Sequence, residues 1–134
     1  MNLILDNISE ISKYLFFLCL ITIIVVSVIP GVNVESYEVS EGFSFRLDYL
    51  LHFLAFFALS TFFLVWRRRK GITAVLITVF IGTFLGFILE FQQIYIIGRT
   101  FNPVDAYLNI AGAMVGLVVA VVVLIRQDKM DLIK

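Results

Sequence analysis

Residues 82–116 read GTFLGFILEFQQIYIIGRTFNPVDAYLNIAGAMVG, and they place strongly polar side chains within very apolar surroundings. Two hydrophobic segments flank a short polar elbow, residues 98–103. Polar side chains recur at helical intervals on either side of it: Glu90 and Gln93 before, Asp105 and Asn109 after. Because a helix turns about 100° per residue, each pair lies on one helix face. The stretch therefore predicts two membrane helices with a buried polar site between them.

Glycines continue the same two faces away from the elbow. Gly82 and Gly86 precede Glu90, and Gly112 and Gly116 follow Asn109. Glycines spaced by four residues allow membrane helices to approach closely. Since they share faces with the polar residues, we expect them to form contacts inside one bundle rather than a dimer interface.

The composition indicates a membrane protein of a single domain, residues 1–134. Hydrophobic residues make up 61% of the chain and charged residues only 15%, which is too few to cover an apolar core in water. The net charge is zero, so nothing favours nucleic acid as a partner, whereas membrane lipids are implied. The single cysteine, Cys19, lies in an apolar run and is expected to pack as a small apolar side chain.

The hydrophobic runs predict an all-α, four-helix transmembrane bundle. Their lengths approach or exceed the ~17–25 residues that a membrane span needs. Residues 1–12 form a short amphipathic lead-in that is either continuous with the first span or folded against it, and residues 31–47 form a loop long enough to lie on the membrane surface. The predicted helices cover residues of about 13–30, 48–66, 72–97 and 103–125.

Basic residues predict the orientation of this bundle. With four spans, both termini share a side with the basic run Arg67–Lys70, which gives that side eight of the 10 basic residues. The other two are Arg46 and Arg99. By the positive-inside rule, both termini are cytoplasmic and the elbow is outside.

The second predicted helix adds polar residues at the same depth. Asp48 and His52 are four residues apart, so they share a face at the outer start of this helix. Glu90 lies about 27 Å along the third helix, which places it in the outer part of a core about 30 Å thick. Asp48, His52, Glu90, Gln93, Asp105 and Asn109 are therefore expected in one layer, with Arg99 above it.

This layer has a structural and a functional interpretation. An ionised Glu90 is costly inside a membrane, so it either pairs with His52 or Arg99 to lock the bundle or lines a polar cavity; the number of polar neighbours favours the cavity. His52 is suited to acid–base chemistry or anion binding. Arg99 either binds an anionic group or closes the elbow through Asp105 or Glu90. No metal-ligand motif such as H-E-x-x-H is present, so we expect no metal and no cofactor, although these side chains could chemically ligate one.

The same residues resemble the VanZ-like family of small bacterial integral membrane proteins. The resemblance rests on Asp48-x-x-x-His52-Phe53, Glu90-x-x-Gln93, Gly98-Arg99 and Asp105-x-x-x-Asn109-x-x-Gly112, and it covers roughly residues 15–125. Tyr49 follows Asp48 where family members often carry Lys, so the resemblance assigns no cation there. It implies a multi-pass protein of the bacterial inner membrane with a role in glycopeptide resistance, in particular to teicoplanin, or in the cell envelope.

Two hypotheses of different classes follow. In the first, an outward-facing polar pocket binds an anionic amphiphile or a lipid-linked cell-wall precursor, with Arg99 and protonated His52 contacting the anion. In the second, a membrane-embedded enzyme performs acid–base chemistry on a lipid-linked headgroup through Glu90 or His52. Because the sequence shows no nucleophile or metal motif, it favours the first.

The orientation is testable with reporter fusions. A fusion at Lys134 should report a cytoplasmic location, and a fusion within residues 33–45 should report an external one, because the basic residues gather on the terminal side. Equal signals from both fusions would exclude the four-span topology.

Overall fold

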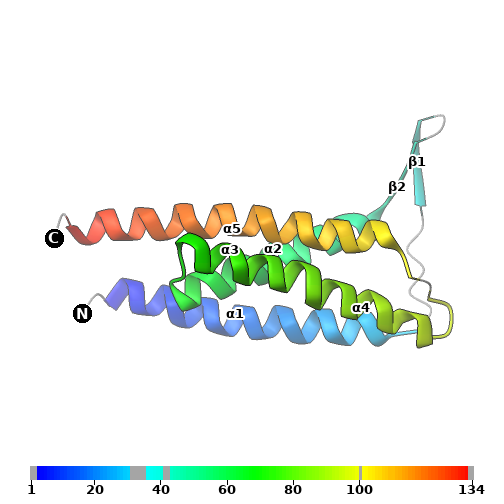
Figure 1. The fold of residues 1–134 in the computed structure, drawn as a ribbon, viewed down its shortest axis with the longest axis horizontal. Helices are drawn as coiled ribbons and strands as arrows, with labels where there is room; N and C mark the ends of the chain where they lie inside the picture. Colours follow the sequence, from blue (N-terminus) through cyan, green and yellow to red (C-terminus); the bar gives the residue numbers. More distant parts are fainter. Residues whose placement is uncertain (1–2, 31–35, 41–42, 100, 133–134) are drawn as a thin grey trace.

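The computed structural model describes residues 3–30, 36–40, 43–99 and 101–132. Among these residues, four helices are long and apolar enough to cross a membrane, as the sequence predicted. They belong to α1 (Leu3–Val28), α2 (Leu47–Arg67), a segmented third helix, and α5 (Pro103–Leu132). Figure 1 shows them side by side in one bundle. Many of their large apolar side chains are exposed, where lipid would contact them.

The third helix is not a uniform α-helix. It consists of α3 (Gly71–Phe80), a π-helical turn (Ile81–Leu85), α4 (Gly86–Gln92) and a final 3-10 turn (Gln93–Tyr95). The chain then leaves the helix through Gly98, whose φ of +80° is a conformation that favours glycine. The π-turn contains Gly82 and ends immediately before Gly86, so it re-aims the residues that follow, including Glu90, relative to those before it.

Two other helices extend beyond their apolar runs. The amphipathic lead-in is continuous with the first span, one of the two predicted arrangements, and Glu10 pairs there with Lys13 one turn later at 3.7 Å. The charged tail continues α5, where Asp128 pairs with Lys70 from the turn between α2 and α3. Local ion pairs and contacts between helices thus extend both helices beyond their apolar runs.

Part of the predicted loop 31–47 is instead an antiparallel hairpin of β1 (Ser36–Ser40) and β2 (Phe43–Arg46). The loop prediction was wrong there because it overlooked the alternation of apolar and polar residues, which is typical of strands. The rest of this loop falls outside the described residues, except for the start of α2 at Leu47. The hairpin and the elbow lie at one end of the bundle, which we call the elbow end, while α1 begins and α5 ends at the opposite end (Figure 1).

The closest helix packing in the bundle involves α2 and α5. A Cβ atom added at Gly112 would lie 2.1 Å from the carbonyl oxygen of Phe53, and one at Gly116 would lie 2.5 Å from that of Phe57. No side chain fits at either position without moving backbone. Only glycine therefore allows α5 to lie this close to α2.

The other glycine pair packs the third helix against α5. A Cβ atom at Gly82 would lie 3.1 Å from the Cβ of Ala113, and one at Gly86 would lie 3.0 Å from the Cβ of Asn109. Both pairs thus form contacts within one chain. They hold α5 between α2 and the third helix, which positions the polar residues described below.

Gly112→Leu should strongly destabilise the protein, because the new side chain meets the Phe53 carbonyl, a backbone group that cannot rotate away. The expected loss is at least the ~1–3 kcal/mol of an overpacked core, measured as a lower melting temperature in detergent. Ala111→Leu is the matched control, because Ala111 is the exposed neighbour on the same helix. Equal melting of both variants would contradict the observed packing.

Candidate functional site

A cavity of about 290 Å³ lies between the helices at the elbow end. Its lining comes from α1, α2, α4, the 3-10 turn, the elbow and α5, so it exists only in the assembled bundle. The structure brings all of the polar residues singled out in the sequence to this one cavity: Asp48, His52, Glu90, Gln93, Arg99, Asp105 and Asn109.

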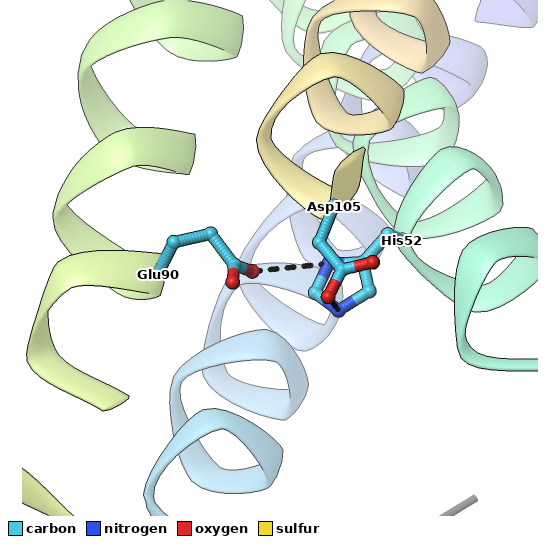
Figure 2. A group of neighbouring side chains, drawn as sticks. All are labelled: His52, Glu90 and Asp105. Atoms are coloured by element: carbon cyan, nitrogen blue, oxygen red, sulfur yellow. Dashed lines mark ion pairs between the residues drawn. The ribbon is translucent and has the colours of Figure 1, made fainter. Parts of the chain in front are cut away.

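Three of these side chains, from three different helices, converge at the centre. Figure 2 shows Glu90 reaching from α4 toward the imidazole of His52 on α2, with Asp105 from the first turn of α5 beside the same ring. His52 Nδ1 lies 3.5 Å from Glu90 Oε1, and His52 Nε2 lies 3.8 Å from Asp105 Oδ2. The imidazole therefore stands between two carboxylates, each facing a different ring nitrogen.

Asn109 holds the imidazole from the side of α5. Its Oδ1 lies 3.1 Å from His52 Nδ1, a hydrogen-bonding distance at which the ring nitrogen can donate. Asn109 itself is fully buried, and its Cβ packs against Gly86. The absence of a side chain at Gly86 thus leaves room for Asn109. Asn109 in turn fixes the orientation of the His52 ring.

Glu90 is the most unusual member of the group. It is 0% exposed, yet among the described residues neither of its carboxylate oxygens meets a hydrogen-bond donor at bonding geometry. The backbone of Asn102 faces the carboxylate outside that geometry. Asp105 and Asp48 add repulsion and Arg99 adds attraction. Since buried carboxylates are normally paired, Glu90 is held at an energetic cost.

Arg99 lines the cavity, but its guanidinium binds the end of α1. It donates to the carbonyl oxygens of Val26, at 3.1 Å, and of Ile29, at 3.3 Å. The last carbonyls of a helix lack partners within the helix and carry partial negative charge, so a cation is favourable there. We expected Arg99 to bind an anion or to pair with Asp105 or Glu90; its contacts with α1 are a third role.

Asp48 and Gln93 complete the polar lining. Asp48 lies in the first turn of α2, and its Oδ1 accepts a hydrogen bond from the backbone N–H of Tyr49 at 3.0 Å. Gln93, in the 3-10 turn, is only 4% exposed. Both lie outside the central cluster of His52, Glu90 and Asp105, so they shape the edge of the cavity rather than its centre.

The contribution of α1 to the cavity was not predicted from the sequence. Thr22 and Ser27 line the cavity from this helix, and Asn102 lines it from the elbow. Ser27 also accepts a hydrogen bond from Gln92 Nε2 at 2.6 Å, which ties α1 to the end of the third helix. The available signal was the presence of Thr22 and Ser27 within the apolar run of the first span.

A family model described as VanZ/LLP1 matches residues 5–125, a region that includes all four membrane-spanning helices except for the last residues of α5. The resemblance noted from the sequence is thereby confirmed. The search of curated proteins and the search of solved structures each returned no match.

Glu90→Gln should leave the stability of the metal-free and ligand-free protein unchanged or raise it, because the change removes a buried charge that has like-charged neighbours and no hydrogen bond. The measurement is the melting temperature in detergent with a chelator present. A structural ion pair with His52 predicts the opposite, a loss of about 3–5 kcal/mol from breaking a buried pair. A large loss would therefore identify Glu90 as a structural residue.

Proposed function

The chain belongs to the VanZ/LLP1 family, and we propose that it binds the polar headgroup of an anionic amphiphile or lipid-linked cell-wall precursor in the cavity at the elbow end. The observation that carries this proposal is the convergence of buried polar side chains from several helices on one cavity within an apolar bundle. Polar and ionisable groups are costly inside a membrane and typically mark a site of function there.

The size and lining of the cavity suit a headgroup with the start of an acyl or prenyl chain. A volume of about 290 Å³ is at the lower end of small-molecule sites. The lining also includes apolar side chains, among them Ile23, Phe56 and Leu89. Leu51, another lining residue, is 53% exposed on the surface that would face lipid, which supports entry of an amphiphile from the membrane.

Arg99 and His52 are the groups that would favour an anion. Arg99 is at the elbow edge of the cavity, where the α1 carbonyls use only part of its five-donor guanidinium. His52 would contribute a positive charge when protonated. Glu90, Asp105 and Asn109 would shape the site and orient the imidazole.

The orientation inferred from the basic residues determines which side of the membrane the cavity faces. We place the protein in the bacterial inner membrane with both termini in the cytoplasm, so that the elbow end faces outward. The cavity would then be at the depth of outer-leaflet headgroups, where lipid-linked envelope precursors are used. Binding such a precursor would connect the protein with the cell envelope and with resistance to glycopeptides of the teicoplanin type.

A second candidate is a membrane-embedded enzyme that performs acid–base chemistry on the bound headgroup. The position of His52 between Glu90 and Asp105 favours it, because a histidine flanked by carboxylates is suited to proton transfer. The two functions differ in one respect. In an enzyme, Glu90→Gln would abolish turnover while binding persists, whereas a binding protein would show no turnover in either form.

Purified protein should bind a polyprenyl phosphate more tightly than phosphatidylcholine. The measurement is native mass spectrometry, first in the presence of EDTA and then after a divalent metal ion has been added. Ala55→Phe, which fills the cavity, and Arg99→Gln, which removes its cation, should each weaken binding about tenfold or more, equivalent to about 1.4 kcal/mol. In a susceptible bacterium, expression of the wild-type protein should raise the inhibitory concentration of teicoplanin, and these variants should not.

The matched controls are Ala111→Phe on the exposed face of α5 and Arg69→Gln at the opposite end of the bundle. Both should bind the polyprenyl phosphate as the wild type does. Equal binding of the two lipids, or equal loss in variants and controls, would overturn the proposed ligand class.

A further inference from the structure

Charged side chains gather at the cavity. Among the described residues, the carboxylates of Asp48, Glu90 and Asp105, the guanidinium of Arg99 and the imidazole of His52 line it. Arg99 is engaged by carbonyl oxygens at the end of α1. A cation at the centre of the cavity would offset the repulsion that Asp105 and Asp48 exert on Glu90, and it would attract an anionic ligand.

The central cluster has the spacing of ligands around one metal ion. His52, Glu90 and Asp105 each offer one donor atom, and these atoms lie within 4.8 Å of one another. The closest approaches of the imidazole are those of Nδ1 to Glu90 Oε1, at 3.5 Å, and of Nε2 to Asp105 Oδ2, at 3.8 Å, and both are longer than hydrogen bonds. One ion binds only one of the two ring nitrogens, and either separation is close to the about 3.4 Å between two ligands that each bind a tetrahedral ion at about 2.0–2.1 Å.

Glu90 supplies an independent indication of a missing partner. Its carboxylate is completely buried, points toward the imidazole (Figure 2), and has both oxygens without a hydrogen bond among the described residues. A buried carboxylate in this state needs a cation or a donor, and none of the described side chains supplies a hydrogen bond.

The surroundings of His52 also suit metal ligation. A metal-binding histidine normally donates its other ring N–H to an acceptor that fixes the ring. Nδ1 faces Asn109 Oδ1 at 3.1 Å, and Nε2 faces Asp105. Nε2 can therefore bind the metal beside Asp105 while the Nδ1–H donates to Asn109.

We propose that His52, Glu90 and Asp105 bind one divalent transition-metal ion, with Zn²⁺ the best fit. One imidazole nitrogen with two carboxylate oxygens is a mixed donor set that suits zinc, whereas Mg²⁺ and Ca²⁺ prefer oxygen donors alone. Three protein ligands leave a position for water or for an oxygen of a bound headgroup. The site stands on these contacts and does not depend on the identity of the amphiphile.

The test measures metal binding to the purified, EDTA-stripped protein in detergent without added lipid, by isothermal titration with ZnCl₂, MnCl₂, MgCl₂ and CaCl₂. The wild type should bind one Zn²⁺ per chain, more tightly than Mn²⁺ and much more tightly than Mg²⁺ or Ca²⁺. Glu90→Gln and Asp105→Asn should each weaken Zn²⁺ binding by more than the ~10–100-fold that follows loss of an outer-shell partner.

Two control variants exclude other zinc sites. Glu10→Gln removes an exposed carboxylate near the opposite end of the bundle, and Cys19→Ser removes the free thiol. Both should bind Zn²⁺ as the wild type does. X-ray absorption at the zinc edge should report nitrogen and oxygen ligands and no sulfur.

Zn²⁺ should also raise the melting temperature of the wild type and not that of Glu90→Gln, so a folded variant is distinguished from an unfolded one. Folded wild type that binds no Zn²⁺, or binding that persists in both acid variants, overturns the metal site. Polyprenyl phosphate binding in EDTA without Zn²⁺ binding would overturn this inference and leave the proposed function standing. Zn²⁺ binding without polyprenyl phosphate binding would support the metal site and overturn the proposed function.

Discussion

The close approach of α2 and α5 is the contact on which the site depends. Within a membrane, apolar side chains gain little by leaving lipid for one another, so helices associate through close packing and hydrogen bonds. Gly112 and Gly116 lie against backbone carbonyls of α2, leaving no room for a side chain. His52 precedes Phe53, whose carbonyl Gly112 contacts, and Asn109 is one turn before Gly112. The packing that joins the helices therefore also brings His52 and Asn109 to 3.1 Å.

The third helix reaches the same site by a different arrangement. Gly86 packs on Asn109, and one turn later Glu90 faces His52. A π-turn over Ile81–Leu85 lies immediately before this segment, and a 3-10 turn follows it. Departures from regular helix often occur near functional sites, where they aim a side chain that a regular helix would place elsewhere. Here the side chain is the buried carboxylate of Glu90, which has no hydrogen bond among the described residues.

The first helix, α1, contributes little to the buried core of the bundle but supplies part of the cavity wall. Much of α1 is exposed to the surroundings, in keeping with a helix that faces lipid. Its end is nevertheless tied to the elbow by Arg99 and to the third helix by the contact of Gln92 with Ser27. These polar contacts close one wall of the cavity.

The sequence by itself determined the number of spans, the fold class and the family. Apolar runs of membrane length require helices in lipid, because backbone groups there must be satisfied within the segment. Helical periodicity also put Glu90 with Gly86 and Asn109 with Gly112 on shared faces, since that depends only on the residues per turn. The hairpin was missed, although the alternation in residues 36–46 was visible in the sequence.

Only the tertiary structure decided which faces meet. The cost of polar groups in lipid made it possible to expect that His52, Glu90 and Asp105 converge. Their spacing could not be predicted, because periodicity along one helix does not determine how the neighbouring helices are rotated. The role of Arg99 was unpredictable for the same reason. Its partners are carbonyl oxygens of α1, about 70 residues away in the chain, and every residue type supplies that group. A backbone acceptor cannot be recognised in a sequence, whereas a carboxylate can. The sequence therefore pointed to Asp105 and Glu90 as partners of Arg99.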